Sequence, residues 1–175
     1  FERFSKNSFD NFILHYHKYD RKYDEQGTVN KYYSESITTK AERDLTFNNK
    51  ISFGYGAEYK YDWGDYTTLT FTSQTKGHLK NLGIFANTGY KFNDNQYLSM
   101  HIRNDDHKET GGNKTYKVNF TQHYKNLKFG LTNSTGLKNP SLYELYGSSS
   151  SHSGSTGIDS EKSTTNELYA EYLFS

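Results

Sequence analysis

Hydrophobic and polar side chains alternate along most of the chain. The clearest run lies between residues 51 and 63, where an apolar register alternates with small or charged residues such as Gly54 and Glu58. That register holds Ile51, Phe53, Tyr55, Ala57, Tyr59, Tyr61 and Trp63. Because successive side chains of a β-strand point to opposite faces of the sheet, this period of two predicts a strand with one apolar and one polar face.

Seven other segments repeat the pattern, so the sequence predicts about eight strands. Their apolar registers are, in chain order, Phe12, Leu14 and Tyr16; Ile37, Thr39, Ala41, Leu45 and Phe47; Leu82, Ile84, Ala86, Thr88, Tyr90 and Phe92; Leu98, Met100 and Ile102; Tyr116, Val118 and Phe120; Leu127, Phe129 and Leu131; and Leu168, Ala170, Tyr172 and Phe174.

Short and long connections alternate between these segments. Asn48-Asn49, Asn93-Asp94-Asn95 and Lys125-Asn126 have the composition of tight hairpin turns. The polar links 24–32, 64–78, 105–114 and 138–160 are longer. Outer-membrane barrels have short periplasmic turns and long extracellular loops. We therefore predict an all-β fold, an antiparallel up-and-down transmembrane β-barrel segment that begins and ends at the short-turn rim.

Aromatic residues gather at both ends of the apolar registers. Phe47, Phe92, Tyr124 and Phe174 lie beside short turns, and Tyr59, Tyr61 and Trp63 approach a long link. Two aromatic girdles flank the apolar band of a transmembrane barrel. Arg43 falls in the same outward register, where a cationic side chain costs about 2–4 kcal/mol at mid-bilayer and about 0–1 kcal/mol near an interface. It is expected at the interface, unless a bulge resets the register.

The composition fits strands. The chain has 175 residues, the size of one domain, and is 32% hydrophobic but 17% aromatic. Its mean hydropathy of −1.01 would suit a disordered chain, but such chains are poor in aromatics. It has no run of the about 18 apolar residues that a transmembrane helix needs, whereas a barrel strand needs only about 10 alternating residues.

Charge and cysteine content narrow the function classes. The formal charge is +1, with basic and acidic residues mixed, which does not suit a nucleic-acid partner. The absence of Cys excludes disulfides and thiolate metal sites. The opening residues 1–4 have no signal-peptide pattern, so a secreted chain is expected to be an internal fragment.

An open sheet edge in lipid would leave backbone groups unpaired at several kcal/mol each. The strands are therefore expected to close on themselves or to belong to a larger barrel. Five glycines in the polar registers suit a wide lumen better than a narrow, side-chain-filled one. They are Gly54, Gly56, Gly83, Gly89 and Gly130.

The most specific motif begins at Gly136. Pro140, Leu142, Glu144 and Leu145 lead into a serine-rich passage, and Glu161, Ser163 and Glu167 follow it. This passage resembles TonB-dependent outer-membrane receptors, in which a strand ends in Gly-x-x-x-Pro-x-Leu-x-Glu-Leu, a long loop follows, and the next strand opens with a Pro-Glu-x-Ser pattern. Here Ser160 replaces the proline.

The resemblance implies that residues 1–175 are a partial barrel domain, with the plug domain and the remaining strands absent. It also implies a location in the bacterial cell outer membrane, in contact with its lipid. Such receptors import a scarce nutrient, a ferric siderophore or cobalamin, and draw energy from TonB through the plug domain. No cofactor is expected.

Ligand contact is expected in the link after Pro140. Tyr143 and Tyr146 offer rigid amphipathic surface of the kind that dominates binding energy. The alternative is that both are tyrosines of the interface belt, where this residue is enriched.

No metal site or catalytic site is assigned. His15 and His17 share one strand face, but the sequence identifies no third ligand. Oxygen ligands for calcium occur at 105–109 and at 20–25, without the spacing of a known calcium loop. No nucleophile-elbow pattern is present, so the protein is not expected to be an enzyme.

Two other proteins would share this pattern. One is a self-contained eight-stranded outer-membrane barrel with a structural or adhesive role. The other is a soluble antiparallel barrel that turns its apolar face inward around an apolar ligand.

Overall fold

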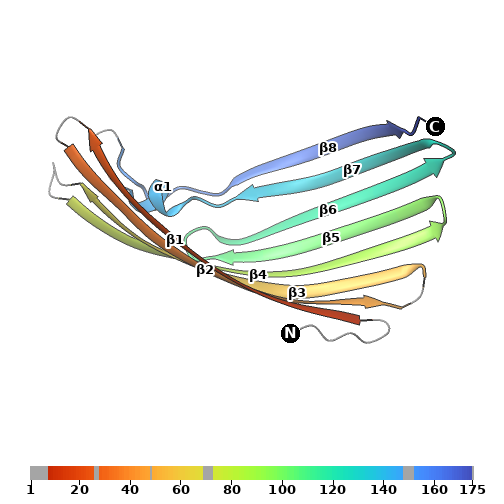
Figure 1. The fold of residues 1–175 in the computed structure, drawn as a ribbon, viewed down its shortest axis with the longest axis horizontal. Coiled ribbons are helices and arrows are strands. Elements are labelled where there is room, and N and C mark those ends of the chain that lie inside the picture. Colours follow the sequence, from red (N-terminus) through yellow and green to blue (C-terminus); the bar gives the residue numbers. More distant parts are fainter. Residues whose placement is uncertain (1–7, 26–27, 48, 69–72, 148–151, 175) are drawn as a thin grey trace.

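The computed structural model describes residues 8–25, 28–47, 49–68, 73–147 and 152–174. They form one curved sheet of eight antiparallel strands, in which each strand pairs with its neighbours in sequence (Figure 1). The elements are β1 (Ser8–Glu25), β2 (Thr28–Thr46), β3 (Ile51–Thr68), β4 (Ser73–Asn93), β5 (Gln96–His107), β6 (Gly111–Tyr124), β7 (Leu127–Lys138), α1 (Leu142–Tyr146) and β8 (Glu161–Tyr172). The predicted all-β, up-and-down arrangement is confirmed.

The two rims of the sheet differ. At one rim, which we call the short-turn rim, β4 joins β5 through Asp94-Asn95 and β6 joins β7 through Lys125-Asn126. Lys125 has a φ of 53°, as a tight hairpin turn requires. The described chain starts and ends at this rim, as predicted (Figure 1).

The opposite rim, which we call the far rim, is built differently from the prediction. Three of the four predicted long links are mostly paired strand. Pairing of β1 with β2 continues to Glu25 and Thr28, and β5 turns into β6 through residues 108–110 alone. Polar residues were interpreted as loop, but both faces of a strand that extends beyond the apolar band are hydrated, so polarity does not end it. Only the link between Lys138 and Glu161 is long, with the boundaries expected.

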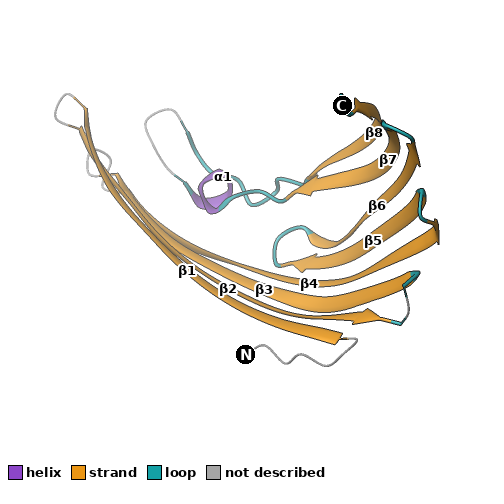
Figure 2. Cartoon of the chain, turned by 45° about the vertical axis from the view of Figure 1, so that its right-hand side comes forward, coloured by secondary structure: helices purple, strands orange, loops and turns teal. Residues whose placement is uncertain are grey.

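The apolar registers all lie on the convex face. Leu14, Ile84, Ile102 and Leu131 are each more than half exposed there. The short helix α1 lies on the opposite, concave face (Figure 2). This arrangement contradicts the soluble alternative, in which the apolar side chains would fill the interior.

The apolar band runs obliquely across the rows of paired residues. Leu14 and Ala170 each lie midway along the apolar register of their strands. The row through Leu14 reaches β4 at Leu82, whereas the row through Ala170 reaches it at Asn93, eleven residues farther along (93 − 82 = 11). Strands of a barrel tilt relative to the barrel axis, which produces this offset between the rows and a level band.

Glycines on the concave face make room for large side chains that lie flat across them. A Cβ at Gly83 would stand 2.2 Å from Nη2 of Arg103, and a Cβ at Gly130 would stand 2.0 Å from the Tyr169 ring. Arg103 spreads over Gly83 and forms ion pairs with Asp105 (2.8 Å) and Glu58 (2.9 Å). The concave face is therefore a polar surface, partly covered by its own long side chains.

Arg43 keeps the outward register, in which its charge is unexpected. No bulge interrupts the pairing of β2 with β1 or with β3. Instead, Nε and Nη2 of Arg43 donate to the two carboxylate oxygens of Asp10 at 2.5 and 2.8 Å. Asp10 stands directly opposite Arg43 on β1, so the sheet register itself brings the two charges together.

Removing one member of this pair is expected to destabilise the sheet more than removing both. Asp10→Ala leaves the donors of Arg43 without their partner and should cost about 1–3 kcal/mol. The double variant Asp10→Ala/Arg43→Ala should recover part of this loss, because no unpaired charge remains. Urea unfolding from lipid vesicles measures both. Equal losses in the single and the double variant would show that the ion pair contributes nothing.

The one compact hydrophobic cluster of the described residues lies at the far rim. It consists of Tyr66, Leu79, Leu142 and Leu145, which come from β3, β4 and α1. No helix among the described residues is long and apolar enough to cross a membrane.

Candidate functional site

The helix α1 begins with a capping box. The hydroxyl of Ser141 accepts the N–H of Glu144 at 3.2 Å, and the carboxylate of Glu144 accepts the N–H of Ser141 at 2.7 Å. Two backbone donors that a helix start leaves unpaired are satisfied in this way. Hydrogen bonding to the Ser141 N–H holds the pKa of Glu144 below its ordinary value. The motif position Glu144 therefore has a local structural role, because it completes the capping box with Ser141, three residues before it.

Two leucines fasten this turn to the concave face. Leu142 and Leu145 are buried against Tyr66 and Leu79, and Leu145 is only 2% exposed. Their spacing of three places both on one side of a single helical turn. Pro140 is buried just before them. The motif thus builds a capped, anchored turn, and the side chains between the leucines point elsewhere.

Tyr143 is the side chain that this anchoring directs toward the strands. Its ring lies 5.9 Å from that of Tyr32 and 5.7 Å from that of Tyr66, and it stacks on the ring of His152 at 4.6 Å. Edge-on and stacked aromatic pairs at these distances are favourable. The result is a rigid aromatic wall made by β2, β3 and the long link.

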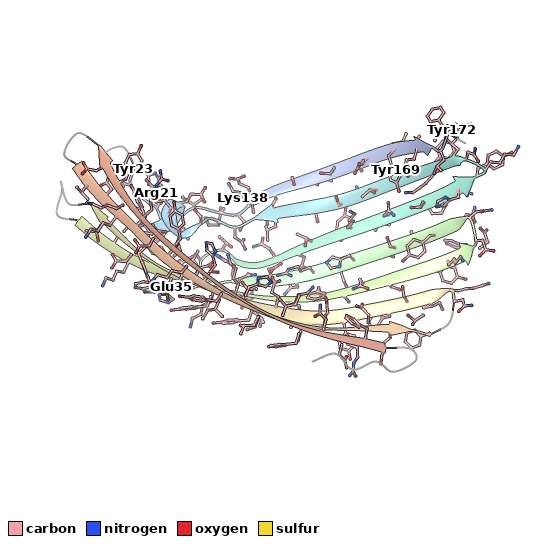
Figure 3. The ribbon with its side chains drawn as sticks, viewed as in Figure 1. Arg21, Tyr23, Glu35, Lys138, Tyr169 and Tyr172 are labelled. Carbon is pink, nitrogen blue, oxygen red and sulfur yellow. The ribbon has the colours of Figure 1, made fainter. Side chains whose placement is uncertain are left out.

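This wall is one side of a hollow on the concave face, with a volume of about 500 Å³. Its lining residues are Tyr19, Arg21, Tyr23, Tyr32, Ser34, Tyr66 and Tyr143. We call it the tyrosine hollow. Figure 3 shows Arg21 and Tyr23 near the end of β1. Ligand sites of this size combine aromatic surface with a few placed polar groups, which describes this lining.

Arg21 is the one charged side chain in that lining. Its guanidinium lies 5.1 Å from the centre of the Tyr23 ring and reaches the Tyr19 hydroxyl with a long contact of 3.5 Å. No carboxylate of the described residues forms an ion pair with it. A guanidinium without a carboxylate partner, held between aromatic rings, is suited to bind an anion.

The second predicted ligand residue, Tyr146, lies away from the tyrosine hollow. Its ring covers Gly77 of β4, and its hydroxyl donates to Glu109 at 2.7 Å. Burial, together with the Glu109 carboxylate, raises the pKa of Tyr146, and the same hydrogen bond lowers the pKa of Glu109. Tyr146 thus connects α1 to the β5–β6 turn, whereas Tyr143 alone faces the hollow.

The remaining motif positions open β8. Glu161 accepts from Lys138 at 2.9 Å across the start of the β7–β8 pair. Ser163 lies opposite Gly136, and Glu167 lies opposite Thr132 in the same pair. None of the three contributes to the lining of the tyrosine hollow. They define where the long link returns to the sheet.

Other candidate ligands are dispersed. His15 and His17 lie on the concave register of β1, opposite Thr38 and Ser36. Asp105 is buried against Arg103 and Asn81, whereas its neighbour Asp106 is exposed on the other face, so the acidic run at 105–109 does not converge. Among the described residues, no group of three His, Asp or Glu is placed to hold a metal ion.

Sequence reasoning missed most of the tyrosine hollow, although a signal was present. Tyr19, Arg21 and Tyr23 continue the polar register of β1, the register opposite Leu14. The apolar register of this strand ends at Tyr16, so the apolar pattern alone does not show that residues 19–23 continue the same two faces. Tyr32 and Tyr66 fell within predicted links.

Disrupting the capping box is expected to loosen α1. Glu144→Ala should destabilise the turn by about 0.5–2 kcal/mol, which faster hydrogen exchange at the Ser141 and Leu145 amides would report. Because the folded pKa of Glu144 is lowered, its contribution is complete above its ordinary value of 4.5 and is lost as pH falls through the lowered pKa.

Glu144→Gln provides the control for this prediction, because glutamine also completes a capping box. It should keep slow exchange at neutral pH and lose the acid dependence. Identical exchange in wild type, alanine and glutamine variants would contradict the role assigned to Glu144.

Comparison with known proteins shows which solved structures share this fold. No protein-family model matches the sequence, and no curated protein matches it. The siderophore receptor PirA from Pseudomonas aeruginosa is similar in structure, with a TM-score of 0.77 over 99% of this chain and 14% sequence identity. The siderophore receptor PirA from Acinetobacter baumannii has a TM-score of 0.70 over 95% of the chain, also at 14% identity.

The chain spans 35% and 33% of the length of these two structures. At 14% identity the likeness is one of fold: the eight strands have the arrangement found in the barrels of these receptors.

Proposed function

We propose that this chain is a barrel-wall segment of a TonB-dependent outer-membrane receptor that imports a ferric siderophore. The observation that carries the proposal is the tyrosine hollow. It combines an aromatic wall with Arg21, lies on the concave face, and is bordered by the link whose motif resembles that family.

The open sheet supports a barrel larger than eight strands. Within the described residues, β1 pairs only with β2, and β8 pairs only with β7. Unpaired edges cost several kcal/mol per backbone group in lipid, so further strands are proposed to continue the wall on both sides. The polar concave face would then surround a plug domain, through which TonB acts.

The chemistry of the hollow favours an anionic ligand that presents aromatic surface. Five tyrosines offer stacking surface and hydroxyl donors, and Arg21 supplies a positive charge in a lining whose described residues include no carboxylate. Ferric chelates of catecholate type carry negative charge on a rigid aromatic shell, which suits both features. The two structural neighbours are named siderophore receptors, which supports the same substrate class over cobalamin. The ferric ion is cargo here and is held by the chelator.

Ligand titration of the protein extracted from its membrane into a neutral detergent tests this function. The ligands are a ferric tricatecholate chelate, a ferric trihydroxamate chelate and cyanocobalamin, followed by calorimetry. Saturable binding of the anionic tricatecholate chelate, with no heat from cyanocobalamin, is expected. Binding of cyanocobalamin alone would replace the substrate class, and no binding of any of the three would leave a structural or adhesive barrel as the better function.

A further inference from the structure

The convex face carries an amphipathic groove that lies apart from the tyrosine hollow. The part nearer the short-turn rim, which we call the lower part, is an apolar depression of about 500 Å³. Its outward-facing lining consists of Ile84, Ala86, Ile102 and Tyr116, with Asn104 and Lys114 at its margin. The upper part is a slot of about 250 Å³ between β6 and β7, lined by Lys114, Thr115, Thr135, Gly136, Leu137, Lys162, Ser163 and Thr164. Lys114 lines both parts, so they form one continuous surface.

The upper slot exists because the sheet separates there. Pairing of β6 with β7 ends at Lys117 and Ser134, although β7 stays paired with β8 up to Lys138. The hydroxyl of Thr135 takes the place of the missing backbone acceptor and receives the N–H of Tyr116 at 2.9 Å. The separation leaves a row of hydroxyl groups between two lysines.

The charge in this slot is not balanced. Neither Lys114 nor Lys162 forms an ion pair with any carboxylate of the described residues, and the lining of both parts contains no Asp or Glu. The nearest acidic residue in the pairing pattern is Asp106, opposite Gly112 and thus one step along the same face from Lys114.

A second hollow on the convex face provides the contrast. It lies over Ala41 and Ala57 and has Arg43 at its margin. There the cation is neutralised, because Arg43 donates both of its hydrogen bonds to Asp10. The groove at Lys114 and Lys162 therefore differs from this second hollow, because its two cations have no carboxylate partner among the described residues.

We propose that this groove binds one molecule of an anionic membrane lipid, with an acyl chain in the apolar depression and the phosphate headgroup between Lys114 and Lys162. The inference rests on the proposed location in a membrane. Lysine is a phosphate ligand, and the hydroxyl groups of Thr135 and Thr164, which lie in the same convex register as the two lysines, supply further donors. The apolar depression lies on the membrane side of the two lysines, in the order in which a lipid presents its tail and its headgroup.

Native mass spectrometry of the detergent-extracted protein tests the site, with phosphatidylglycerol, phosphatidylcholine and inorganic phosphate as separate probes. One phosphatidylglycerol adduct is expected to persist where phosphatidylcholine dissociates. Lys114→Glu/Lys162→Glu should weaken it by about 30-fold, as the loss of two lysine contacts to an anionic lipid predicts. Ala86→Phe fills the depression and should weaken the adduct without changing charge.

The matched control is Lys22→Glu/Lys31→Glu. These lysines oppose each other on the convex register of β1 and β2, so the charge change is the same at another place on the same face. Binding within about twofold of wild type is expected. Equal loss of the adduct in both double variants would mean that the surface attracts anionic lipid in general. Equal retention of phosphatidylglycerol and phosphatidylcholine would overturn the lipid site. Lysine-dependent binding of inorganic phosphate as tight as that of the lipid would overturn it as well.

Titration with the ferric chelate separates this inference from the proposed function. A folded variant that has lost the lipid adduct should bind the chelate as wild type does, since the groove and the tyrosine hollow lie on opposite faces. Loss of chelate binding in all proteins, with the lipid adduct intact, would contradict the receptor function and leave the lipid site standing. Failure of the lipid adduct alone would contradict only the lipid site.

Discussion

Arg21→Glu is expected to weaken binding of an anionic ferric chelate by at least about 10- to 100-fold. A charge-assisted hydrogen bond contributes about 1.5–3 kcal/mol, and the reversed charge adds repulsion to that loss. The effect should be this large because Arg21 supplies the only charge in the lining of the tyrosine hollow. Calorimetric titration with the ferric tricatecholate chelate measures it.

The neighbouring residue provides the control. Lys22 has the same formal charge but lies in the other register of β1, on the convex face opposite Lys31. Lys22→Glu changes the net charge by the same amount and should leave chelate binding within about twofold of wild type. If both variants lost affinity equally, long-range attraction by the whole surface would explain binding, and Arg21 would have no specific role.

The comparison of Arg21 with Lys22 requires that the two side chains lie on opposite faces of β1, and the sequence is sufficient to predict this. The alternation of Phe12, Leu14 and Tyr16 determines which side of β1 faces outward, and a strand without a bulge keeps that assignment to its end. The pairing of β1 with β2 is uninterrupted from Ser8 to Glu25. Strand number, order, face and the short turns were all predictable for this reason, because each depends on a period of two and on turn chemistry.

The ends of β1 to β6 at the far rim were not predictable in the same way, whereas those of β7 and β8 were. A strand that leaves the apolar band has polar residues on both faces, so its sequence resembles that of a loop. Tyr32 and Tyr66 therefore lay in apparent links, although they form the wall of the tyrosine hollow. Arg43 is a related case, since its partner Asp10 lies 33 residues away and is identified only by the register.

The residues of the motif after Gly136 could be identified from the sequence, but their structural role could not. Pro140, Leu142, Glu144 and Leu145 were singled out because they resemble a family pattern, and the structure gives each a physical task in a capped and anchored turn. The motif residues themselves do not line the tyrosine hollow. Tyr143, which lies between them, does, because the two leucines determine the direction in which it points. The family pattern thus identified the residues that hold the turn in place, rather than the residues that line the tyrosine hollow.

Leu145→Ala is expected to release the long link from the concave face. Leu145 is 2% exposed in a cluster of four buried residues, and truncating a buried leucine costs about 2–5 kcal/mol. A cluster this small has little other burial to offset that loss. The turn should detach locally while the strands stay paired, because the backbone of α1 lies close to β3 and β4 alone among the strands and pairs with none of them.

Hydrogen exchange and limited proteolysis measure the release. The amides of Leu145, Gly154 and Ser155, which donate to Ser141, Gly147 and Glu144, should exchange far faster than in wild type. Protease should cleave between residues 139 and 160. The affinity for the chelate should fall in the same variant, since Tyr143 loses its position against Tyr66.

Leu131→Ala is the matched control, because it removes the same atoms from a leucine that is 56% exposed on the convex face. It should leave the exchange of the link and the binding of the chelate unchanged, since Leu131 contacts neither α1 nor the hollow. Fast exchange in the link of the Leu131 variant, or slow exchange in that of the Leu145 variant, would mean that the two leucines do not hold the turn. In that case the position of Tyr143 would have to be maintained by its ring contacts with Tyr32, Tyr66 and His152 alone.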